Sequence, residues 1–145
     1  MQGFCDPFNR APYHVESASL RDDYRFLGQL RETHAALRTG AVAAFAPALD
    51  VICILRTTAD GADAFGDGQK KETFLTVINR ADKEVWTELD ITDPGMGLEE
   101  SVRLALIRCA FTSAKDVASK DCIAVENGVI ALKLPPCSAK IYQLG

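Results

Sequence analysis

From residue 41 onward the sequence is divided into short stretches rich in β-branched and aromatic residues, bounded by Gly, Pro, Asn and Asp. The stretches are 41–46, 49–57, 73–79, 85–91, 122–125, 129–134 and 139–144. Parallel strands would need helical crossovers between them, which this spacing does not provide. The pattern therefore predicts a mainly β fold, an antiparallel β-sandwich of about seven strands. Asn127-Gly128 predicts a tight hairpin turn between two of these strands.

One stretch departs from the β pattern. In residues 97–120, Leu98, Val102 and Leu106 have helical spacing, whereas Val102, Leu104 and Leu106 also alternate as in a strand. We expect an extra helix here, with a strand as the alternative.

An amphipathic helix precedes the β-rich part. Ser19 is a suitable cap, and Asp22 stands where the acid of a capping box would lie. Apolar residues then recur on one face, at Leu20, Tyr24, Phe26, Leu27, Leu30 and Leu37. We expect the helix to end within residues 36–38, with Gly40 supplying the left-handed residue that terminates it.

Composition limits the class of protein. The chain has 145 residues, of which 48% are hydrophobic and 25% charged, so it suits one globular core rather than a disordered segment. The net charge of −4 disfavours binding to nucleic acid and to anionic lipid. The longest apolar run, 51–55, is too short to span a membrane, and no signal sequence is visible. We therefore expect no nucleic-acid or membrane partner.

The cysteines predict no metal or redox site. The five are scattered and form no C-x-x-C pair; they are Cys5, Cys53, Cys109, Cys122 and Cys137. We expect reduced thiols in a cytoplasmic protein, with Cys53 as a small core residue, no cofactor and no metal.

The first fifteen residues have no helical or alternating period and are expected to form a loop. Within it, Asp6 and Arg10 lie four residues apart among aromatic side chains. A carboxylate and a guanidinium so placed can form paired hydrogen bonds with vicinal hydroxyls, while aromatic faces support a sugar ring. The alternative is a salt bridge that only stiffens the loop.

Three segments carry a family resemblance. Residues 3–13, GFCDPFNRAPY, resemble the G-x-x-D-P-x-N-R segment of the α-amylase family of glycoside hydrolases, particularly the neopullulanase, cyclomaltodextrinase and amylopullulanase branch. Residues 27–40 resemble that family's last barrel helix and the turn after it. The closing pattern of the family's C-terminal domain is similar to residues 127–142.

The resemblance implies a division of the chain. Residues 1–40 would be the last βα loop and last helix of a (β/α)8 barrel, and residues 41–145 the C-terminal β-sandwich domain. A complete barrel needs about 250 residues, so the barrel here would be incomplete. The sequence then represents a C-terminal fragment. Its apolar helix face must pack on the sandwich, pair with another copy or fray, so self-association through this face is one expectation.

The resemblance also implies a function. The complete enzyme would hydrolyse α-glucan or maltodextrin by the retaining route, which needs two carboxylates. Both would belong to earlier barrel loops, so we expect no catalytic residue in this chain and no activity from it alone. By the same resemblance Asp6 and Arg10 contact the sugar at an outer subsite. The alternative is a free-standing, non-catalytic module that binds carbohydrate or is purely structural.

Other candidates are weaker. His14 and His34 have no neighbouring Ser or Cys that would suggest a triad, and His34 is expected to be a packed or half-exposed residue. The aspartates of residues 60–68 lack EF-hand spacing and are better explained as a solvated loop between strands. Trp86 lies outward if Val85, Thr87 and Leu89 face inward, which would suit a sugar platform; a lone aromatic is more often a core or interface residue, so we leave it out of the site.

Overall fold

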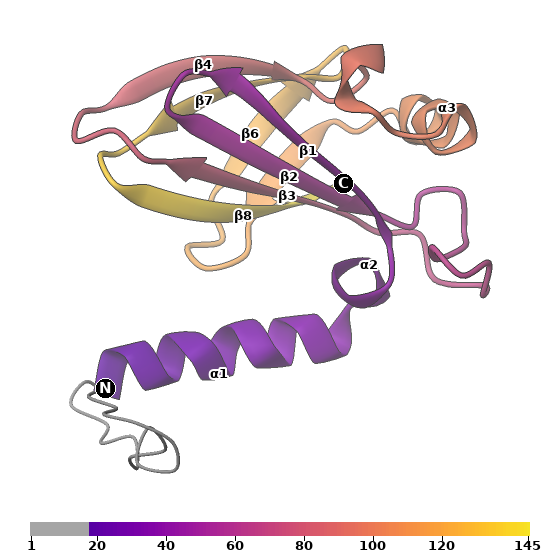
Figure 1. The fold of residues 1–145 in the computed structure, drawn as a ribbon, viewed down its shortest axis with the longest axis horizontal. Coiled ribbons are helices and arrows are strands. Elements are labelled where there is room, and N and C mark those ends of the chain that lie inside the picture. Colours follow the sequence, from indigo (N-terminus) through magenta and orange to yellow (C-terminus); the bar gives the residue numbers. More distant parts are fainter. Residues whose placement is uncertain (1–17) are drawn as a thin grey trace, which may run out of the picture. The chain divides into compact units, whose positions relative to one another are not determined.

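The computed structural model describes residues 18–145, which are shown as a coloured ribbon in Figure 1. The chain divides into two compact units, Met1–Thr33 and His34–Gly145. Several residues singled out from the sequence lie outside the described part; these are Cys5, Asp6, Arg10 and His14.

The predicted amphipathic helix is confirmed as α1 (Ala18–Thr33). Ser19 lies within the helix, so the expectation that it caps the helix is wrong. It ends earlier than expected, because His34 adopts an extended conformation with φ −116° and ψ 115°. A short helix, α2 (Ala35–Arg38), follows in the second unit. Large apolar side chains of α1 are exposed, among them Leu20, Tyr24, Phe26 and Leu27.

Gly40 does not adopt the predicted left-handed conformation, so that expectation is wrong. A glycine is needed there because the backbone is crowded. A Cβ at this position would lie 2.5 Å from the carbonyl oxygen of Ala36 and 2.8 Å from that of Thr57. Gly40 thus lets α2 and the chain leaving it approach the end of a strand closely.

Eight strands form one antiparallel sheet. They are β1 (Ala41–Ala48), β2 (Val51–Thr57), β3 (Thr73–Asn79), β4 (Val85–Asp90), β5 (Ser113–Asp116), β6 (Cys122–Glu126), β7 (Val129–Leu134) and β8 (Ser138–Leu144). Their order in the sheet is β1-β2-β3-β8-β5-β6-β7-β4. The predicted mainly β, antiparallel fold is confirmed.

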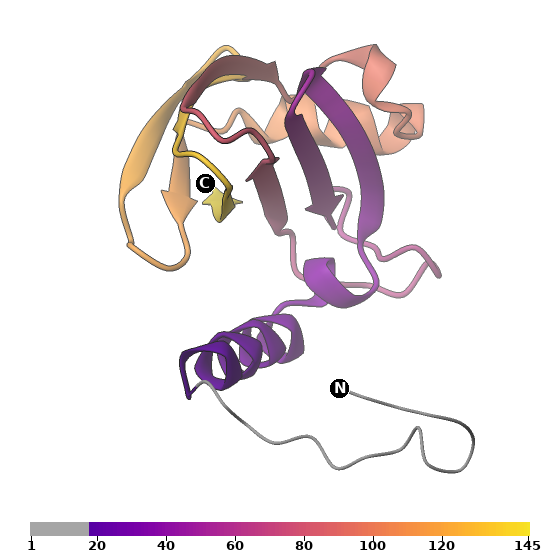
Figure 2. The same ribbon diagram turned by 60° about the vertical axis from the view of Figure 1, so that its left-hand side comes forward.

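The sheet curls until it is nearly closed. Its two end strands, β1 and β4, approach each other (Figures 1 and 2). The two faces expected of a sandwich are joined into one sheet by β8, which pairs with β3 on one side and β5 on the other. The described residues between β4 and β5 contain the 3-10 turn η1 (Pro94–Met96) and the helix α3 (Glu100–Cys109).

The core lies inside this curl. Alternate residues of β2 are buried, including Cys53, as its place in the apolar run predicts. Burial raises the pKa of the Cys53 thiol to about 12. The opposite wall is supplied mainly by β7 and β8, through Ile130, Leu132, Leu134, Tyr142 and Leu144.

Of the local predictions, one turn and one helix are confirmed, whereas one strand and the position of the first hairpin turn differ from expectation. The Asn127-Gly128 turn is confirmed, since both residues have positive φ, 52° and 82°, and the strands on either side pair. The helix expected in residues 97–120 is α3. The strand β5 within the same stretch was not among those predicted. The sequence predicts the first two strands at 41–46 and 49–57, with the turn between them. Instead β1 continues through Pro47 and Ala48, and the hairpin turns at Leu49-Asp50.

A buried carboxylate organises the turn between β5 and β6. Asp116 is 4% exposed, and its Oδ1 accepts the backbone N–H groups of Ala118 and Ser119 at 2.9 and 3.3 Å. The Lys140 ammonium lies 3.5 Å from Oδ2. Burial raises the pKa of the Asp116 carboxyl, but these hydrogen bonds and the Lys140 charge outweigh it, so the pKa lies below its ordinary value.

A lowered pKa makes the Asp116 carboxylate stabilising at neutral pH and progressively less so as the pH falls through its folded-state pKa. Relative to Asp116→Asn, the protein should therefore have a higher free energy of unfolding at pH 6–7, and the difference should shrink below about pH 4. Urea denaturation across this range measures it. Asp82→Asn, at an exposed position, is the control and should follow the unaltered protein. A difference that stays constant across the range contradicts the prediction.

Candidate functional site

The sugar-binding residues predicted from the first loop, Asp6 and Arg10, lie outside the described residues. Their role stays a prediction. The described part of the chain offers four other places where polar groups or an aromatic surface gather, all in the unit His34–Gly145.

The first is a histidine–carboxylate pair beside α2. His34 Nδ1 lies 3.1 Å from Glu72 Oε1, and the same oxygen lies 3.2 Å from Lys70 Nζ. The Glu72 side chain is 5% exposed, and the His34 ring packs on Phe74 with centroids 4.7 Å apart. The extended conformation of His34 between the helices directs its ring onto β3. The expectation that His34 is a packed residue is confirmed.

The second is the loop between β2 and β3, where the sequence places three aspartates. Asp63 Oδ1 accepts the backbone N–H groups of Phe65 and Asp67, both at 3.0 Å, and Oδ2 lies 3.4 Å from Gln69 Nε2. Burial raises the pKa of the Asp63 carboxyl. Hydrogen bonds from the Thr39 side chain and from the three groups just named outweigh this effect, so the pKa lies below its usual value.

Asp63 therefore serves as an internal acceptor that fixes the loop. Asp60 accepts the N–H of Ala62 at 3.2 Å in the same way. Among residues 18–145, no group of three or more His, Cys, Asp or Glu side chains is placed to hold a metal ion. The expected loop between strands is confirmed, with a bridge between Ala62 and Gly68.

The third is the exposed Trp86 on β4. Its outward position is confirmed, with 69% of the residue exposed. The indole Nε1 donates to Glu84 Oε1 at 3.1 Å, and Lys133 Nζ lies 5.1 Å from the ring centroid. Glu84 and Lys133 also pair with each other at 3.2 Å. Glu84 and Lys133 thus contact the indole while leaving much of it open to solvent.

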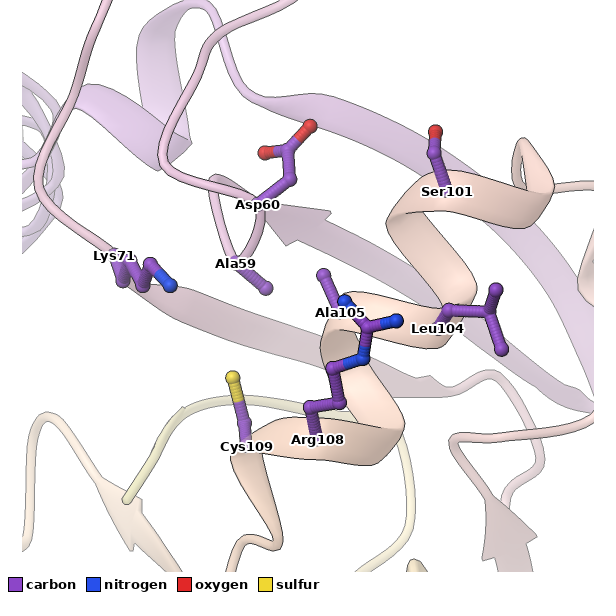
Figure 3. Close-up of a pocket in the computed structure, with 8 residues that line it drawn as sticks. All are labelled: Ala59, Asp60, Lys71, Ser101, Leu104, Ala105, Arg108 and Cys109. Atoms are coloured by element: carbon purple, nitrogen blue, oxygen red, sulfur yellow. The ribbon is translucent and has the colours of Figure 1, made fainter.

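The fourth is a cavity of about 680 Å³ between α3 and the ends of the β2–β3 loop (Figure 3). It is lined by Ala59, Asp60, Lys71, Ser101, Leu104, Ala105, Arg108 and Cys109. Sequence reasoning missed this site because its polar residues belong to segments far apart in the chain. Only the pairing of strands and the position of α3 bring them together.

The comparisons with known proteins agree with the family resemblance. No family model matches the chain. An amylopullulanase of Thermoanaerobacterium saccharolyticum is 28% identical over 94 residues, or 63% of this chain and 7% of the relative. An amylopullulanase of Thermoanaerobacterium thermosulfurigenes is 24% identical over 140 residues, or 95% of this chain and 7% of the relative. The chain thus spans about 7% of the length of the curated relatives that it matches.

Solved structures share the fold. An Anoxybacillus α-amylase matches with a TM-score of 0.67 and 23% identity, covering 100% of this chain and 26% of that one. An α-amylase from Geobacillus thermoleovorans, in complex with acarbose, matches with a TM-score of 0.65 and 18% identity, covering 100% and 27%. The amylopullulanases confirm the resemblance to the C-terminal part of an α-amylase-family enzyme. The two solved α-amylases show that the fold is shared. No described helix is long and apolar enough to span a bilayer.

The packing of His34 predicts a structural role. His34→Ala removes the ring from Phe74 and leaves the buried Glu72 carboxylate with Lys70, whose side chain is 80% exposed, as its remaining charged neighbour. We expect the free energy of unfolding to fall by about 1–3 kcal/mol, measured by urea denaturation. Arg31→Ala, at an exposed position of α1, is the control and should change it little. A His34→Ala variant as stable as the unaltered protein contradicts this role.

Proposed function

We propose that this chain is the C-terminal part of a glycoside hydrolase of the α-amylase type that degrades α-glucan by the retaining route. The observation that carries the proposal is the similarity to an amylopullulanase along 95% of the chain. The shared fold with α-amylases supports it. The two carboxylates that retaining hydrolysis needs would lie outside these 145 residues, so the chain supplies binding and structure rather than chemistry.

In this proposal residues 1–40 are the last βα loop and last helix of the catalytic barrel, and residues 41–145 are its accessory β domain. The apolar side chains exposed on α1, Leu20 and Tyr24 among them, support the assignment, because a barrel helix covers its strands with such a face. In the isolated chain the same face would favour self-association.

Asp6 and Arg10 would bind the glucan at an outer subsite. A carboxylate accepts hydrogen bonds from sugar hydroxyls, and a guanidinium donates to them, so the pair can hold two neighbouring hydroxyls at once. Binding away from the cleaved bond helps to position the reacting sugar. We further propose a cytoplasmic location, which the free thiols of Cys53, Cys109, Cys122 and Cys137 support.

A second candidate is a free-standing carbohydrate-binding module. The exposed indole of Trp86 favours it, since an open aromatic face is a suitable platform for a sugar ring. The two candidates differ in what the 145 residues do alone.

The native protein that contains this chain, captured from its source cells with an antibody, should release reducing sugar from maltodextrin. The 145-residue chain alone should release none and should give no measurable heat when titrated with maltotetraose, because one subsite does not offset the cost of ordering a flexible sugar. Measurable affinity of the isolated chain, lost in Trp86→Ala, supports the binding module instead. A captured protein without glucanase activity contradicts the enzyme proposal.

Within the complete enzyme, Asp6→Ala and Arg10→Ala should each lower kcat/KM for maltotetraose about tenfold, mainly through a higher KM, since each removes a charge-assisted hydrogen bond. Arg10→Lys keeps the charge without the forked donor, so its kcat/KM should lie between those of the unaltered enzyme and Arg10→Ala. Thermal melting is the parallel measurement. A lower melting temperature with unchanged KM would show that the two residues only brace the loop.

A further inference from the structure

We propose that the cavity between α3 and the β2–β3 loop binds a small phosphate monoester bearing hydroxyl groups, such as a sugar phosphate. The proposal uses neither Asp6 nor Arg10 and does not depend on the glucanase proposal. It is built entirely within the unit His34–Gly145.

Two cations point into this cavity. Figure 3 shows Lys71, from the end of the β2–β3 loop, and Arg108, from α3, extending toward the same space. Neither forms an ion pair with any residue in the described range 18–145. Several other cations in that range are paired with carboxylates, among them Arg25, Lys70, Arg80, Lys133 and Lys140, whereas Arg103 and Lys115 also form no ion pair within it.

The lining favours an anion. Asp60 is its one carboxylate, and that group accepts the N–H of Ala62. The two cations therefore outnumber the negative charge locally, although the chain as a whole carries −4. An ammonium offers a point charge and a guanidinium a planar fork, and the two together suit the several oxygens of a phosphate.

The remaining surface suits a small hydroxylated body. About 680 Å³ is within the range of pockets that hold small organic ligands. The Ser101 hydroxyl and the Asp60 carboxylate offer hydrogen bonds to hydroxyl groups, while Ala59 and Ala105 provide an apolar wall against which a ring can lie. These features select a phosphorylated polyol over a bare metal ion or a purely apolar molecule.

Cys109 provides a built-in reporter. It lines the cavity and is half-buried, whereas Cys122 and Cys137 are exposed elsewhere and Cys53 is buried in the core. A ligand in the cavity should slow alkylation of Cys109 by N-ethylmaleimide without slowing that of Cys122 or Cys137. Peptide mass spectrometry follows each cysteine separately in the 145-residue chain.

The probes are glucose 6-phosphate, inorganic phosphate and glucose, at matched ionic strength. Glucose 6-phosphate at ten times its Kd should slow Cys109 alkylation about tenfold and raise the melting temperature saturably. Inorganic phosphate should protect more weakly, and glucose should not protect. Lys71→Gln combined with Arg108→Gln should abolish both effects. The matched control, Arg103→Gln with Lys115→Gln, removes two unpaired cations outside the cavity lining and should preserve them.

Specific outcomes overturn the proposal. Equal protection by glucose would show that charge does not select the ligand. Protection that persists in the Lys71/Arg108 double variant would place the ligand elsewhere. Absence of both protection and a melting shift with either phosphate probe would show that the cavity binds no such anion. All three are independent of whether the complete protein degrades glucan, so failure here leaves the glucanase proposal intact.

Discussion

The second unit of this protein depends on the pairing of its last strand. β8 lies between β3 and β5, so it joins the part of the sheet formed by β1–β3 to the part formed by β5, β6, β7 and β4. β4 strengthens this interleaving, because it follows β3 in sequence but pairs with β7 at the other end of the sheet. Neither part can bury its inner face without the other. The curled sheet is therefore one cooperative structure, although hairpins account for much of its local pairing.

The strands that could be predicted are those whose inner face is apolar and whose ends carry turn residues. Residues 73–79 and 129–134 match β3 and β7 residue for residue. β5 reads SAKD, too short and polar to show a pattern, and it becomes a strand because β6 and β8 pair with it and bury Ala114 and Asp116. The sequence predicts a left-handed stop at Gly40, whereas the reason a glycine is necessary there is a tertiary contact with the carbonyl of Thr57, which sequence does not reveal.

For the candidate sites too, features set by the local sequence could be predicted, and features set by tertiary contacts could not. The outward position of Trp86 follows from the alternation along β4, and the packed state of His34 follows from its apolar neighbours in sequence. The partner of His34 could not be predicted, since Glu72 belongs to a loop end that reaches α2 only through the β2–β3 pairing. The shared cavity of Lys71 and Arg108 could not be predicted either, because each residue alone resembles an ordinary solvated cation in the sequence.

Buried polar contacts fix the segment that carries Lys71. Thr57 and Thr73 share a hydrogen bond of 2.8 Å at its base, and Thr58 donates to the Lys70 carbonyl at 2.7 Å just before Lys71. Farther out, Asp63 holds the loop through its backbone N–H bonds. Because these bonds fix the backbone of the loop, binding has to order the Lys71 side chain but not the segment that carries it, which lowers the entropic cost. The polar residues that the fold buries beside β2 and β3 therefore also preorganise one wall of the cavity, and α3 supplies the other.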